Sequence, residues 1–149
     1  MKISPTPEVG LMVDWETGKI KTGLFSGINV GYESKLIRPT ATGEVRSITM
    51  YDGDSGRRMG SLEYEIDGSK VKVNGFSFDD WSDKRMPQGF INYFIKKMKK
   101  RGVKKVEVEL YDVDSKTHDK LTVFKDLKFD TDTTGNMTGY QSWLMTKNI

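Results

Sequence analysis

The segment from residue 70 to residue 110 constrains the fold more than any other part of the chain. Its middle carries one apolar stripe at the helical spacing i, i+1, i+4, i+5 and i+8, formed by Phe90, Ile91, Phe94, Ile95 and Met98. Pro87 suits the first turn of this helix, and Gly102 suits its end. Apolar and polar residues alternate in 70–78 and 103–110, which indicates strands. A strand, a helix and a strand in this order predict a right-handed crossover between parallel strands.

The remaining segments add further strands and a second helix. Two short alternating segments precede residue 70 and predict an antiparallel meander with it, and Gly75 interrupts the alternation, which predicts a β-bulge. Leu121, Phe124 and Leu127 follow a helical spacing. The expected strands are 44–51, 61–67, 70–78, 103–110, 128–131 and 140–147. The order βββαβαββ predicts an α+β fold with a mixed sheet and both helices in the C-terminal part.

Residues 1–43 are rich in Gly, Pro, Ser and Thr and show no helical period. The clearest local signal is a β-hairpin with strands 11–15 and 19–25 and a turn at residues 16–18. We therefore expect a divergent N-terminal arm with a hairpin, 1–43, and a domain, 44–149. Because a free hairpin cannot bury its own apolar side chains, the arm is expected to pack on the sheet, to self-associate or to bind a protein partner. These side chains are Leu11, Val13, Trp15, Leu24 and Phe25.

The composition excludes several kinds of site. The chain has no cysteine, which excludes disulfides, thiolate catalysis and cysteine-based zinc sites, and its one histidine, His118, excludes multi-histidine sites. No metal site is expected. No apolar run approaches the roughly 18 residues of a membrane-spanning helix, and the N-terminus lacks the apolar core of a signal peptide. A cytoplasmic location without membrane contact is expected, or a place in a virion if a phage encodes the protein.

Several segments in this order resemble the C-terminal two-thirds of the GNAT superfamily of N-acetyltransferases. They are the meander, the helix with its apolar pair Phe90-Ile91 and its closing Gly102, the strand 103–110, and the segment 124–129 followed by the strand 140–147. The resemblance covers about residues 44–147. It implies a GNAT-like mixed sheet and the transfer of an acetyl group from acetyl-CoA to an amine.

Three departures from the family pattern bear on this activity. The family binds the pyrophosphate of acetyl-CoA with an Arg/Gln-x-x-Gly-x-Gly/Ala loop, whose backbone N–H groups reach the phosphates at a helix N-terminus. The slots of this loop fall on Ser82, Arg85 and Pro87, and proline has no N–H to donate. The tyrosine that many members use as general acid falls on Phe124, and the glycine of the same motif falls on Lys128. The two helices that the family carries between its first two strands have no counterpart in residues 1–43.

The candidate site residues follow from the resemblance. If acetyl-CoA binds, the resemblance implies Arg85, Gln88 and Gly89 as the cofactor-binding residues. No catalytic residue is assigned, although strand carboxylates act as a base where they line a cleft. The carboxylates in question are Glu63, Glu65, Glu107 and Glu109.

A basic stretch spans residues 96–105, where seven of ten positions are cationic. It is either a polyanion-binding patch or a solvated helix face that continues into a loop. The lysines of the possible patch are Lys96, Lys97, Lys99, Lys100, Lys104 and Lys105. Acidic residues lie close in the sequence, at 79, 80, 83, 107 and 109, and for this reason we do not expect nucleic acid to bind.

Three functions remain open at this stage. The first is a degenerate acetyltransferase fold without a cofactor that serves as an interaction or structural module, for example in a phage. The second is an active N-acetyltransferase that uses acetyl-CoA. The third is a nucleic-acid-binding module built on the basic helix. The three departures favour the first function, because fold alone does not establish activity.

Overall fold

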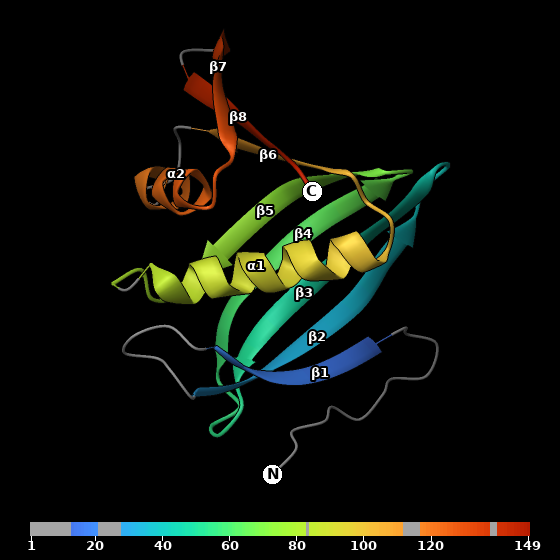
Figure 1. Ribbon diagram of the computed structural model, residues 1–149, viewed down its shortest axis with the longest axis vertical. Coiled ribbons are helices and arrows are strands. Elements are labelled where there is room, and N and C mark those ends of the chain that lie inside the picture. The colour runs from blue at the N-terminus through green and yellow to red at the C-terminus, as the bar shows by residue number, and fades with distance from the viewer. Residues whose placement is uncertain (1–12, 21–27, 83, 112–116, 138–139) are drawn as a thin grey trace.

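The computed structural model describes residues 13–20, 28–82, 84–111, 117–137 and 140–149 (Figure 1). Over these residues the chain forms one eight-stranded sheet and two helices. The strands are β1 (Val13–Ile20), β2 (Ile28–Pro39), β3 (Gly43–Asp52), β4 (Arg58–Asp67), β5 (Lys70–Phe78), β6 (Lys105–Tyr111), β7 (Asp130–Met137) and β8 (Tyr140–Asn148). The helices are α1 (Arg85–Lys100) and α2 (Thr117–Asp126). The strand order across the sheet is β1-β2-β3-β4-β5-β6-β8-β7.

The sheet is mixed. β5 and β6 pair in parallel, whereas each of the other neighbouring pairs described is antiparallel. α1 connects the two parallel strands, as the predicted strand–helix–strand unit requires. The predicted α+β fold, with both helices in the C-terminal part, is confirmed. The sheet is larger than expected because β1 and β2 precede the six strands that the sequence predicted.

α1 lies across one face of the sheet and buries the predicted stripe there (Figure 1). All five stripe residues are buried and share one core cluster with most of the buried apolar residues of β3 to β6. The helix ends where Gly102 takes a φ of +86°. The N–H of Val103 donates to the carbonyl of Met98, and the N–H of Gly102 donates to the carbonyl of Lys99, which is the Schellman pattern. Periodicity and the closing glycine therefore predicted this helix correctly.

The β-bulge predicted at Gly75 is present. Glu63 pairs with Gly75 and Tyr64 pairs with Val73, so Asn74 is the extra residue on β5. The bulge shifts the alternation of β5 by one position. As a result, the apolar residues before and after the bulge all face the same core, namely Val71, Val73, Phe76 and Phe78.

The N-terminal segment differs from the prediction. Residues 16–18, expected to form a hairpin turn, lie inside β1, which pairs with β2 along its whole length. The predicted hairpin is therefore wrong, because pairing with a neighbouring strand outweighs the local turn preference. β2 also pairs with β3 and contributes Val30, Tyr32 and Ser34 to the buried interior. The segments 13–20 and 28–39 thus belong to the sheet, and an independent fold for 44–149 stays a prediction.

The side chains that we expected to drive packing of the arm lie outside the described residues. Leu11, Leu24 and Phe25 fall in segments that the structure does not describe, and of β1 only the backbone is described. Self-association through the arm therefore stays a prediction. β1 does form one edge of the sheet, since its only described neighbour is β2.

No helix lies between β2 and β3 in the described stretch 28–52, where only residues 40–42 connect the two strands. α1 and α2 lie on the same face of the sheet, because Gln88 of α1 donates a hydrogen bond to Asp126 of α2 and Phe76 of β5 contacts rings from both helices. The opposite face of the central strands carries the alternate, polar side chains, among them Ser47, Thr49, Ser61, Glu63, Glu65 and Lys72. Val45 pairs with Glu65 on this face and is only 1% exposed although it lies outside the core cluster, so the face is mainly but not entirely polar.

The residue that follows the last turn of α2 has a left-handed backbone conformation, and a substitution there can measure what this conformation costs. Lys128 has a φ of +69°, and the N–H of Phe129 donates to the carbonyl of Phe124, so Lys128 occupies the position that glycine usually takes after a helix. A side chain in this conformation costs about 1 kcal/mol. Lys128→Gly is therefore expected to raise the free energy of unfolding by about 1 kcal/mol, measured by urea denaturation.

The matched control for this change is Lys125→Gly, in the last turn of α2. The same replacement there is expected to lower the free energy of unfolding by about 1 kcal/mol, because glycine is a poor helix former. A loss of stability in both variants would show that the conformation of Lys128 carries no strain.

Candidate functional site

The carboxyl ends of β5 and β6 are the natural place for a site in this sheet. Crevices outside the carboxyl ends of parallel strands commonly bind ligands. The two strands pair only from Lys70 with Lys105 to Val73 with Val108, although β5 continues to Phe78 and β6 to Tyr111. They separate at the bulge.

A hollow of about 210 Å³ lies at this separation, lined by Lys72, Val73, Asn74 and Glu109. Of the four strand carboxylates considered from the sequence, Glu109 is the one that lines this hollow. Glu107 pairs with Lys70 and Lys105 at 3.8 and 3.6 Å. Glu109 is therefore the described carboxylate best placed to accept a proton in this hollow.

The residues predicted to hold a cofactor lie in the first two turns of α1. Arg85 is exposed at the start of the helix, whereas Gln88 and Gly89 are half-buried. The side-chain amide of Gln88 donates to Oδ2 of Asp126 at 3.1 Å, so this residue joins the two helices. Lys84, just before the helix, donates to the carbonyl of Trp81 and pairs with Asp119 at 2.9 Å. Two of the polar side chains at this helix end are thus engaged in contacts within the protein.

Phe124 is a core residue. Its ring has no solvent exposure and makes edge contacts with Phe76 and Phe129, at centroid distances of 5.8 and 5.1 Å. Phe76 also contacts Trp81 and Phe90, so one aromatic cluster fills the space between α1, α2 and the end of β5. An apolar ring in this position stabilises the packing but cannot donate a proton.

These residues do not fit the pyrophosphate of acetyl-CoA as the family pattern would hold it. Pro87 is buried in the first turn of α1 and contributes no N–H. Gly89 lies inside the helix, where its N–H belongs to the helical hydrogen-bond pattern. The charge of Arg85 remains at the helix start. In the family's loop, glycines and backbone N–H groups allow phosphate to approach closely. At the start of α1, these positions are largely occupied by side chains that pack against the rest of the protein.

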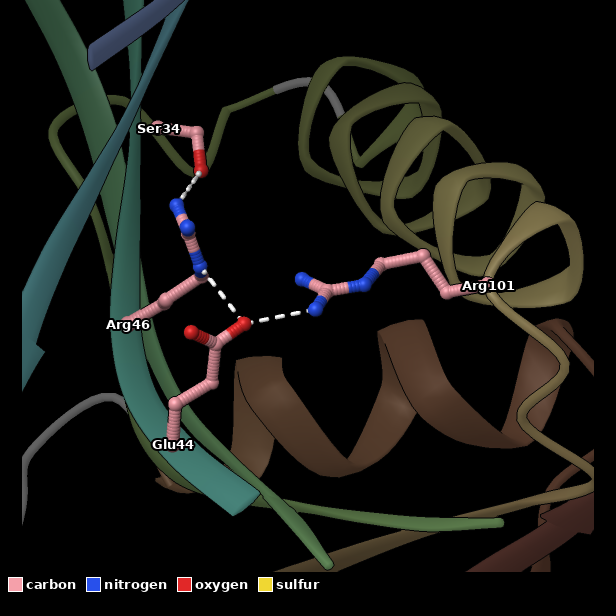
Figure 2. A network of polar contacts seen from close by, with 4 residues as sticks. All are labelled: Ser34, Glu44, Arg46 and Arg101. Carbon is pink, nitrogen blue, oxygen red and sulfur yellow. Dashed lines mark hydrogen bonds and ion pairs between the residues drawn. The ribbon is translucent and has the colours of Figure 1, made fainter. Parts of the chain in front are cut away.

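A polar cluster that the sequence did not predict lies between β3 and the end of α1 (Figure 2). Oε1 of Glu44 accepts hydrogen bonds from Arg46 at 2.9 Å and from Arg101 at 2.6 Å. Arg46 also donates to the hydroxyl of Ser34 at 3.3 Å. Arg46 and Ser34 are only 5% and 2% exposed, so a charged guanidinium is buried inside the fold. The pair Glu44 and Arg46, two apart on one strand, is the only part of this cluster that sequence spacing could have indicated.

Electrostatics in this cluster favour the ionised carboxylate. Burial alone raises the pKa of Glu44, but hydrogen bonds from Arg101 and Arg46 and their positive charges together hold the pKa below its ordinary value. Burial also raises the pKa of Tyr64, which stands opposite Arg46 on β4, and this effect outweighs the opposing influence of Ser34 and Arg46. At neutral pH the cluster therefore contains a carboxylate, two guanidinium groups and a neutral phenol.

The basic residues of the possible polyanion patch lie at the end of α1 and in the turn that follows. Lys96, Lys99, Lys100, Lys104 and Lys105 are exposed, and Lys97 is half-buried. The structure thus brings five of the six to the surface at one end of one helix. Among the described residues neither helix is long and apolar enough to span a membrane.

Comparison with solved structures identifies the fold. The ribosomal-protein-S18-alanine N-acetyltransferase of Escherichia coli matches over 74% of this chain and 71% of its own, with a TM-score of 0.54 and 14% identity. An acetyltransferase assigned to the GNAT family, from Desulfovibrio desulfuricans, matches over 70% and 69%, with a TM-score of 0.59 and 7% identity. The PaiA N-acetyltransferase of Thermoplasma acidophilum, solved with coenzyme A, matches over 70% and 61%, with a TM-score of 0.56 and 14% identity.

The chain therefore has the fold of the GNAT acetyltransferases, as the sequence resemblance implied. The similarity is one of structure, since identities of 7–16% accompany these and comparable matches. No family model matches the sequence, and no curated protein is significantly similar to it in sequence.

Proposed function

We propose that this GNAT-fold protein does not transfer acetyl groups and serves as an interaction or structural module. The observation that carries the proposal is the complete burial of Phe124 within an aromatic cluster, at the position where the family resemblance places a proton-donating tyrosine. Pro87 and the contact of Gln88 with Asp126 support it, because both remove groups that would hold a pyrophosphate.

Binding of acetyl-CoA, measured by isothermal titration calorimetry on the full chain, tests this proposal. We expect a dissociation constant weaker than about 1 mM, which corresponds to less than about 4 kcal/mol of binding free energy. A low-micromolar constant that Arg85→Ala abolishes would contradict the proposal. Phe124→Tyr is a useful companion, because a new hydroxyl in this buried cluster is expected to lower stability without creating binding.

A second candidate function rests on the hollow at the bulge. Glu109 lines this hollow beside Asn74, at the point where the parallel strands separate, and a carboxylate in such a place suits a general base. The solved PaiA structure with coenzyme A shows that a protein of similar fold holds this cofactor. Under this alternative the chain is an acetyl-CoA-dependent N-acetyltransferase. This alternative predicts that the chain binds acetyl-CoA tightly and acetylates an amine. It also predicts that Glu109→Gln abolishes the acetylation.

A further inference from the structure

Four lysines at the C-terminal end of α1 and in the following turn are exposed and make no ion pair with any described residue. They are Lys96, Lys99, Lys100 and Lys104, which we call the lysine ridge. Lys96, Lys99 and Lys100 are three and four positions apart on the helix, so their side chains share one face. Like charges at this spacing repel one another. The ridge is therefore a concentration of positive charge that no ion pair within the described part of the chain neutralises.

The basic stretch that contains the ridge stands out against the rest of the chain. Residues 96–105 hold seven of the 24 Lys and Arg side chains and no Asp or Glu, so the remaining residues carry a net charge of −4 against +3 for the whole chain. α1 itself contains no acidic residue over its sixteen positions. A positive potential confined to one end of a weakly charged molecule attracts a polyanion to that end.

Of the acidic residues that argued against polyanion binding, Asp79 and Asp80 lie at the other end of α1 from the ridge, and Glu107 is already paired. Asp79 and Asp80 precede α1, whereas the ridge begins at Lys96, eleven residues after the first residue of the helix, which is about 17 Å along its axis at 1.5 Å per residue. Glu44 is held by two arginines, and Glu107 by two lysines. Proximity in the sequence therefore overstated the negative charge around the ridge.

We propose that the lysine ridge binds the phosphate backbone of duplex nucleic acid without reading its sequence. Lysine ammonium groups bind phosphates as point charges. α1 lies on one face of the sheet, and the side of the helix that points away from the sheet can approach a convex duplex (Figure 1). The proposal is independent of acetyl-CoA, because the ridge lies at the other end of α1 from Arg85 and Gln88.

Other anionic partners suit the ridge less well. A single strand is usually bound by exposed aromatic rings, but Phe90 and Phe94 of α1 are buried and Tyr93 stacks on Tyr32 at 3.6 Å. A membrane-surface helix exposes apolar side chains beside its cations, whereas those of α1 face the sheet. Acidic protein partners favour arginine, and lysine is depleted from protein interfaces. The phosphate backbone of a duplex requires none of these features.

Fluorescence anisotropy of a labelled 20-base-pair duplex of mixed sequence, titrated with the full chain, tests the proposal. Binding is expected at 50 mM salt and should weaken about 100-fold by 200 mM, because neutralising about four phosphates gives a slope near −3.6 in log K against log salt. Replacing all four ridge lysines by glutamine is expected to lower the affinity at 50 mM salt at least about tenfold and to bring the slope close to zero.

The matched control replaces four lysines elsewhere by glutamine, at Lys35, Lys72, Lys125 and Lys128, and therefore changes the net charge equally. Its affinity should stay within about threefold of the unchanged chain, since local charge and not net charge is proposed to bind. The proposal is overturned by no binding at 50 mM salt, or by an equal loss in the control. It is also overturned if the single strand, vesicles with 30% phosphatidylserine or polyglutamate bind more tightly than the duplex.

Discussion

Replacing Phe94 with alanine is expected to lower the free energy of unfolding by about 3–5 kcal/mol. Phe94 is 1% exposed and lies at the centre of the interface between α1 and the sheet, where its ring contacts that of Tyr64 edge-on at 5.0 Å. Removing the ring loses its burial and leaves a cavity that rigid neighbours on β4 cannot fill. Urea denaturation measures this loss directly, provided that the dependence of the free energy of unfolding on urea concentration is the same in both proteins.

Asn92 provides the control for this variant, because it lies on the same helix and is exposed. Asn92→Ala is expected to leave stability unchanged or to raise it by a few tenths of a kcal/mol, through the higher helix propensity of alanine. Equal midpoints for Phe94→Ala and the unchanged chain would contradict the packing of α1 described above.

Replacing Glu44 with glutamine is expected to cost about 3 kcal/mol, because it leaves the buried guanidinium of Arg46 without its counter-charge. Since folding lowers the pKa of Glu44, its contribution is fully present above the carboxyl's ordinary pKa. The contribution is lost as the pH falls through the lower pKa of the folded state. Stability measured from pH 7 down to pH 3 should therefore fall less steeply in Glu44→Gln than in the unchanged chain.

Arg101→Gln separates the buried interaction from the exposed one. The Arg101 side chain is 38% exposed, and an exposed ion pair is worth only about 0.2–1 kcal/mol, so this variant should lose little. If Glu44→Gln lost no more stability than Arg101→Gln, the buried guanidinium of Arg46 would not require Glu44 as its counter-charge.

The C-terminal two-thirds of the fold could be predicted because its signals are local. The stripe of α1 repeats at a helical period over nine residues, and Gly102 and Gly75 mark the helix end and the bulge. β2 was missed although Val30, Tyr32 and Ser34 alternate toward the core. Gly31 and the polar Ser34 weaken that alternation in the sequence, and pairing with β3 is what stabilises the strand.

The candidate site was less predictable than the fold. The family pattern identified the positions of Arg85, Gln88 and Phe124, but not that Gln88 bonds to Asp126, which is 38 residues away. The contact of Glu44 with Arg101 spans 57 residues and has no local signal. Long-range polar contacts depend on how the helices and strands pack, and no periodicity in one segment encodes them.

The parallel seam between β5 and β6 is the shortest pairing between neighbouring strands described in the sheet. Only four residue pairs join the strands β1 to β5 to the strands β6, β8 and β7, whereas neighbouring strands within each block pair over at least seven. Opening the seam exposes few backbone hydrogen bonds and leaves both blocks paired internally. The two blocks are instead joined through side chains, because residues of β6, α2 and β8 belong to the same core cluster as those of β3 to β5 and α1. Side-chain packing therefore contributes more than backbone pairing to holding the C-terminal block in place.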